Sequence, residues 1–119
     1  YYGIRSVYDG RYRYIVNLTP EATFQNVETK SPLFKEWKSL AETDSHAKAM
    51  TTKYQHRPAI ELYDVKNDPY CMKNLAEDAK QASTISRLDK ELKRWMKDCG
   101  DEGQPTEMRA FEHMPGKRK

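Results

Sequence analysis

One amphipathic helix near the end of the chain most constrains the fold. Apolar residues recur at helical spacing over residues 84–98, and charged residues fill most of the remaining positions. Ser83 or Thr84 is expected to begin this helix, and Gly100 stands where a left-handed C-terminal cap is expected. The apolar stripe must be covered by another element. It consists of Ile85, Leu88, Leu92, Trp95 and Met96.

Alternating residues at the start of the chain predict a β-hairpin over residues 3–18. Asp9 and Gly10 favour a tight two-residue loop between its strands. In that arrangement Arg5 and Val7 share a face with the tyrosine-rich side of the second strand, which therefore needs cover. That side consists of Tyr12, Tyr14, Val16 and Leu18, and the opposite side carries Arg11, Arg13 and Asn17.

Further elements fill the middle of the chain. Ser31 and Pro32 begin a predicted helix over residues 32–42, a weaker helix follows over residues 45–54, and residues 59–65 read as a strand. We therefore expect an α+β fold, a small antiparallel sheet packed against helices, over residues 1–103. The tail, residues 104–119, has no periodicity and is expected to be peripheral or disordered.

Composition narrows the classes of function. Of 119 residues, 37% are hydrophobic and 33% are charged, and the net charge is only +3, so the chain has no strong field to attract polyanions. We expect neither nucleic acid nor a membrane as partner, because no basic stripe, membrane span or signal peptide is evident. The chain starts at Tyr1 without methionine, so an upstream targeting signal would not be visible.

Residues suited to catalysis or metal binding are scattered. The three histidines, His46, His56 and His113, form no metal-binding pair, and Cys71 and Cys99 read as structural thiols. Residues 64–68 offer oxygen ligands, but we prefer to see Asp68 as the cap of a short helical turn that starts at the following proline.

The hairpin arginines and tyrosines allow two interpretations. Arginines 5, 11 and 13 interleaved with tyrosines 8, 12 and 14 suit a surface for single-stranded nucleic acid or a sulfated sugar. Arginine opposite tyrosine is also a common solvated pair on neighbouring strands, and we prefer this second interpretation.

Several segments nevertheless resemble the end of sulfatases. Residues 61–70 and 74–78 are similar to a family signature of Glu-Leu-Tyr-Asp, Asp-Pro and Asn-Leu-Ala. Residues 4–7 and 11–18 resemble the hairpin that begins the C-terminal subdomain of these enzymes. Residues 31–34 and 57–58 are similar to the heparan N-sulfatase branch, also called sulfamidase.

The resemblance implies a C-terminal subdomain that packs on its own N-terminal catalytic domain and helps shape a pocket for sulfated glycans, most simply heparan-type chains. Formylglycine and calcium are implied for that catalytic domain. Neither Cys71 nor Cys99 lies in the required Cys/Ser-x-Pro-x-Arg motif, so the chain alone should be inactive. The family implies a periplasmic, exported or lysosomal location.

Three residues are candidates for contact with the glycan: Arg5 on the tyrosine face, and His56 and Arg57 ahead of the strand. An interdomain ion pair for Arg5 and a solvated His56 are the alternatives, and we prefer them. Two other functions stay open, a free-standing module that binds glycan or nucleic acid and a small enzyme complete in itself. The face left by an absent catalytic domain would also favour self-association.

Overall fold

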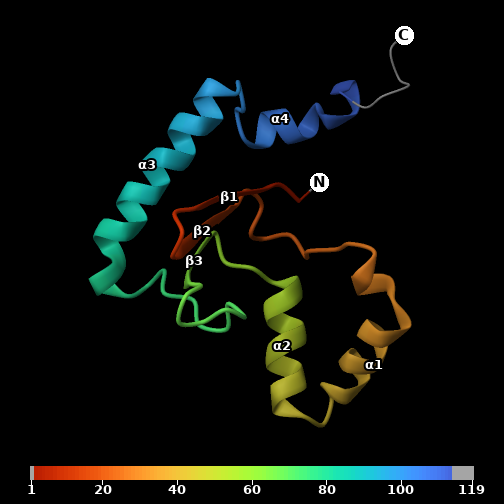
Figure 1. Ribbon diagram of the computed structural model, residues 1–119. Coiled ribbons are helices and arrows are strands. Elements are labelled where there is room, and N and C mark those ends of the chain that lie inside the picture. The colour runs from red at the N-terminus through yellow and green to blue at the C-terminus, as the bar shows by residue number, and fades with distance from the viewer. Residues whose placement is uncertain (1, 114–119) are drawn as a thin grey trace.

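A computed structural model describes residues 2–113, and three strands and four α-helices make up its main elements (Figure 1). The strands form one antiparallel sheet in the order β1-β2-β3. Helix α3 crosses one side of this sheet, while α1 and α2 lie on the other side (Figure 1). The expected α+β class is therefore confirmed.

The sheet is built from β1 (Ile4–Tyr8), β2 (Tyr12–Asn17) and β3 (Ile60–Asp64). Val7 lies opposite Tyr14 on the neighbouring strand. Because side chains alternate along a strand, both residues face α3, as the sequence predicted.

The loop of the hairpin is longer than expected. Tyr8 lies opposite Arg13 rather than Arg11, so the predicted two-residue loop is wrong. The Asp9 carboxylate accepts the backbone N–H of Arg11 at 3.0 Å, and Gly10 adopts a φ of 98°, which together stabilise the wider turn. The register changes by an even number of residues, so each side chain keeps its predicted face.

Packing of α3 (Ala82–Asp98) on the sheet forms the core. Its centre consists of four side chains that are at most 2% exposed. They are Tyr14, Leu62, Leu88 and Leu92. Partly buried apolar residues surround them, including Val7, Val16, Ile85 and Met96.

The ends of α3 differ in how well the sequence predicted them. The helix begins at Ala82, before Ser83, because a 3-10 turn at Ala79–Gln81 leads directly into it. At the other end Gly100 has a φ of 70° and the N–H of Asp101 donates to the carbonyl of Met96 at 2.7 Å. This is the expected glycine cap.

Two capped helices lie beyond the opposite face of the sheet. The Ser31 hydroxyl caps α1 (Pro32–Leu40), and the Asp44 carboxylate caps α2 (Ser45–Gln55). Helix α1 ends before residue 42 because the chain turns at once to bring Asp44 to the start of α2, where its N–H donates to the carbonyl of Leu40 at 2.9 Å.

The tail, expected to be peripheral or disordered, continues as α4 (Gln104–Met108) and a 3-10 turn at Ala110–His113. Residues 114–119 of the expected tail lie outside the described residues. Over residues 2–113, no helix is both long enough and apolar enough to cross a membrane.

Replacing Leu62 by alanine tests the core. Leu62 is fully buried, so Leu62→Ala is expected to lower the free energy of unfolding by about 2–5 kcal/mol through lost packing and a residual cavity. Val27 is 83% exposed, and Val27→Ala should change it by less than about 0.5 kcal/mol. Urea denaturation measures both values, and equal effects would contradict this assignment of the core.

Candidate functional site: a basic and aromatic cavity

A cavity of about 590 Å³ lies between the second face of the sheet and helices α1 and α2. We call it the basic cavity. Its lining includes strand residues from β2 and β3, aromatic residues from both helices, and three cationic side chains. The residues that decide its chemistry are Arg13, Lys53, Arg57, Glu61, Trp37 and Tyr54.

A buried carboxylate forms part of the sheet wall. Glu61 is 5% exposed and accepts a hydrogen bond from the Tyr63 hydroxyl at 2.6 Å and another from the Asn17 side-chain amide at 2.8 Å. Burial raises the pKa of Tyr63, and the bond to Glu61 acts in the same direction. Tyr63 therefore stays protonated at neutral pH and remains a donor.

Aromatic rings form the helical wall. The Tyr54 ring lies 5.5 Å from that of Phe34 and 5.7 Å from that of Phe24, measured between centroids. Trp37, one turn after Phe34 on α1, continues the series at 6.5 Å and is 49% exposed. These rings give an apolar wall in which the Phe24–Tyr54 pair is edge-to-face and the Phe34 pairs are tilted.

The three cations of the basic cavity each lie over an aromatic ring. Arg57 is 4.5 Å from the Phe24 centroid, Arg13 is 5.7 Å from that of Tyr8, and the Lys53 ammonium is 5.2 Å from that of Tyr63. Lys53 also donates to the carbonyls of Cys71 at 2.6 Å and Met72 at 2.9 Å. It therefore holds the loop after β3 against α2.

The local sequence explains the position of Arg57. Helix α2 ends at Gln55, and His56 follows in an extended conformation. A proline at position 58 disfavours helical backbone at Arg57, which directs the chain into β3. Arg57 is thus placed at the junction of α2 and the sheet.

The three candidates from the sequence do not come together. Arg57 lines the basic cavity, but His56 is exposed at the end of α2 and is not part of the lining. Arg5 lies on the α3 face of the sheet, opposite Val16, away from the cavity.

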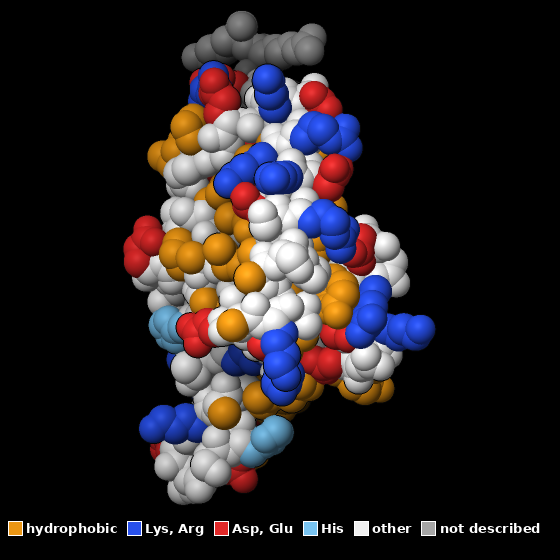
Figure 2. Space-filling model, turned by 90° about the vertical axis from the view of Figure 1, so that its left-hand side faces the viewer, with side chains coloured by type: hydrophobic (Ala, Val, Ile, Leu, Met, Phe, Trp, Pro, Cys, Tyr) orange, Lys and Arg blue, Asp and Glu red, His pale blue; other side chains and the backbone are white. Residues whose placement is uncertain are grey.

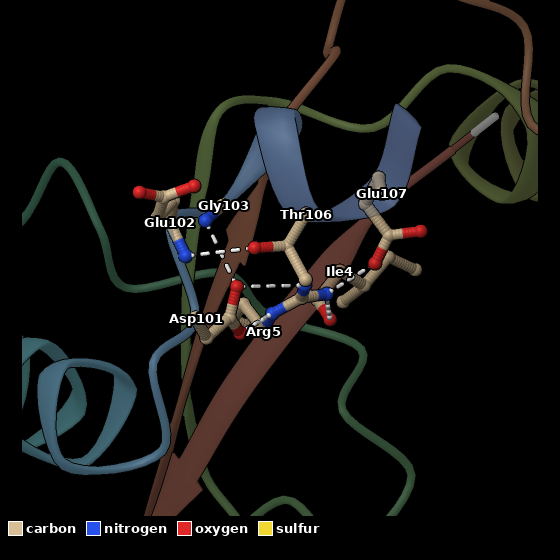
Figure 3. Close-up of polar contacts among 7 residues, drawn as sticks. All are labelled: Ile4, Arg5, Asp101, Glu102, Gly103, Thr106 and Glu107. Carbon is tan, nitrogen blue, oxygen red and sulfur yellow. Dashed lines mark hydrogen bonds and ion pairs between the residues drawn. The ribbon is translucent and has the colours of Figure 1, made fainter. Parts of the chain in front are cut away.

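Arg5 has carboxylate partners within the chain (Figure 3). Its guanidinium bonds to both carboxylate oxygens of Asp101 and donates to Glu107 at 2.7 Å. Its side chain is 14% exposed. The hydrogen bond from Arg5 lowers the pKa of Asp101. Arg5 therefore joins β1 to the segment after α3 and to α4.

The other hairpin residues are also divided between environments. Arg11 pairs with Asp64 at 2.8 Å at the edge of the sheet, whereas Arg13 lies at the basic cavity. Tyr14 is buried under α3, where burial raises its pKa to about 12. The arginine and tyrosine residues of the hairpin thus do not form one continuous surface.

The oxygen-rich turn after β3 has internal partners. Asp64 bonds to Arg11 and to the side-chain amide of Asn67, and the Asp68 carboxylate accepts the N–H groups of Met72 and Lys73. Asp68 caps this turn, as expected. The residues that follow it, 69–70, form a turn without helical structure. Among the residues described, no three His, Cys, Asp or Glu side chains are grouped to hold a metal ion.

The sequence alone did not predict that Trp37, Lys53 and Glu61 line the same cavity. Trp37 falls within the predicted helix over residues 32–42, and Glu61 within the signature at residues 61–70. Their meeting depends on how α1 and α2 fold back over the sheet, and no short-range pattern specifies that contact.

Arg5→Gln tests the pairing in Figure 3. Loss of charge-assisted bonds to Asp101 and Glu107 should lower the free energy of unfolding by about 1.5–3 kcal/mol at pH 7. Because the pKa of folded Asp101 is below its ordinary value of 3.8, the stability it adds is full above that pH and is lost as pH falls through the folded pKa.

The difference between the wild type and Arg5→Gln should therefore shrink in strong acid. Denaturation series between neutral and acidic pH measure it, with Lys90→Gln, an exposed cation on α3, as control. A difference independent of pH would contradict the role of Asp101.

Comparison with known proteins shows which of them are similar to this chain in sequence. No family model matches the chain. Two relatives named ulvan-active sulfatase, both from Formosa agariphila, are similar to it. One is 33% identical over 108 residues, or 87% of this chain, and the other is 32% identical over 97 residues, or 82%. The chain spans 18% of the length of each relative. It is thus related in sequence to a segment of sulfatases, which supports a sulfatase subdomain.

Proposed function

We propose that the chain is the C-terminal subdomain of a sulfatase that acts on sulfated glycans. The similarity to sulfatases, which extends over 87% of this chain but only 18% of the relative, is the observation that carries this proposal. Most of the relative's length lies outside the matched segment, and that length is enough for a separate catalytic domain. The motif resemblance at both the hairpin and the β3 turn supports the same assignment.

The proposed substrate is a sulfated polysaccharide. The relatives are named for activity on ulvan, whereas the segments at residues 31–34 and 57–58 resemble heparan N-sulfatases. Both suggest a polyanionic glycan, so ulvan and heparan-type chains are the substrates to compare. An exported or lysosomal location belongs to the same proposal.

Catalytic groups are assigned to the other part of the protein. Cys71 is followed by Met and Lys, and Cys99 by Gly and Asp, so neither fits the motif that yields formylglycine. The described residues also offer no grouped acidic side chains for calcium. In this proposal the chain positions and binds, and its partner domain performs the hydrolysis.

Part of the rim of the basic cavity is the proposed docking face for that domain. Large apolar side chains stand exposed around it, each by about half or more. They are Leu40, Tyr70 and Met72. Apolar surface gathered at one place favours contact with protein, and in the isolated chain it favours self-association.

A free-standing nucleic-acid module has less support. On the α3 side of the molecule, Lys and Arg side chains alternate with Asp and Glu (Figure 2). Ion pairs along α3, such as Lys93 with Asp89 and Arg94 with Glu91, account for part of this alternation. Nucleic-acid modules instead present a one-sided basic surface.

Release of inorganic sulfate tests the proposal. The intact protein that carries this chain should release sulfate from ulvan or heparin oligosaccharides, and ion chromatography measures it. The 119-residue chain alone should release none, because it has no candidate nucleophile in the required motif. No release by the intact protein from either glycan would overturn the assignment.

A further inference from the structure

The basic cavity holds Arg13 and Arg57, which form no ion pair, unlike the other arginines among the described residues. Among the residues described, the arginines and lysines that form ion pairs lie elsewhere. They are Arg5, Arg11, Arg87, Lys93, Arg94 and Arg109. Arg13, Lys53 and Arg57 line one cavity, and none of them lies within ion-pair distance of a carboxylate among these residues.

The one carboxylate in the lining, Glu61, offsets only one of the three positive charges. Each oxygen of Glu61 already accepts a hydrogen bond, one from Tyr63 and one from Asn17. Glu61 is buried in the sheet wall, and its bonds hold it there. The basic cavity therefore retains an excess of positive charge that a bound anion would neutralise.

Donor groups remain for such an anion. The Lys53 ammonium donates hydrogen bonds to two backbone carbonyls. Arg57 makes only one long hydrogen bond, 3.5 Å from its Nε to the carbonyl of Tyr54. Its terminal nitrogens, and the whole Arg13 guanidinium, have no hydrogen-bond partner among the residues described. A guanidinium fork suits the planar or tetrahedral oxygens of carboxylate and sulfate.

We propose that the basic cavity binds an anionic sugar residue of the glycan. Arg13 and Arg57 contact its sulfate or carboxylate, and the exposed ring of Trp37 offers an apolar face to the sugar ring. This inference deepens the proposed function and rests on it for the identity of the glycan.

Variants that remove one positive charge test the site. Binding of a heparin-derived tetrasaccharide and its desulfated counterpart to the intact protein is measured by isothermal titration calorimetry. Arg13→Gln and Arg57→Gln should each weaken binding of the sulfated form by about tenfold or more, as expected for a lost charge-assisted bond. The desulfated form should bind weakly to every variant.

The matched control is Lys90→Gln, which removes the same charge from the exposed face of α3. It should leave binding unchanged, which separates a defined site from general attraction of a polyanion. Arg13 is exposed, so Arg13→Gln is expected to fold normally even if loss of the Arg57 contacts with Phe24 and Tyr54 destabilises the second variant. Thermal melting of each variant checks this.

The outcomes separate the two proposals. Weaker binding by Arg13→Gln with an unchanged Lys90→Gln supports the site whether or not sulfate is released. Equal binding of the glycan by Arg13→Gln and Lys90→Gln overturns the proposed site, even in a protein that hydrolyses its glycan. Another segment of that protein would then be the occupant of the basic cavity. Absence of sulfate release from any glycan tests only the proposed function.

Discussion

Packing of α3 on one face of a three-stranded sheet is the interaction on which the rest of the structure depends. Leu88 and Leu92 bury Tyr14 and Leu62, and this contact commits one face of each strand to the core. Side chains of the opposite parity then face α1 and α2. The basic cavity exists because these two short helices lie over the second face without filling it.

Charge is arranged in two ways on these two faces. On the α3 face, Arg5 is enclosed by Asp101 and Glu107, and the glycine cap at position 100 brings Asp101 to that place. Removing one partner of such a buried pair is destabilising, and the pairing leaves little charge for a ligand. On the other face, Arg13 and Arg57 lie over aromatic rings rather than beside carboxylates. Their charge remains available to an anion.

Local patterns predicted the elements better than the site. Hairpin faces were right although the loop was wrong, because the Asp9 side chain changed the register by an even number of residues. The end of α3 was right because Gly100 meets a specific backbone requirement. Arg57 was identified from its place before β3, but its neighbours Trp37 and Glu61 come from distant segments and meet only through tertiary packing. Asp101, the partner of Arg5, lies far away in the sequence, so no local pattern predicted this ion pair.

Tandem mass spectrometry of the natural intact protein tests the central claim most directly. If the chain is a sulfatase subdomain, peptides preceding Tyr1 will include a Cys/Ser-x-Pro-x-Arg motif, and the Cys or Ser of that motif will have the mass of formylglycine. A natural protein that begins immediately before Tyr1, with no such peptide, would contradict the account and favour a free-standing binding module.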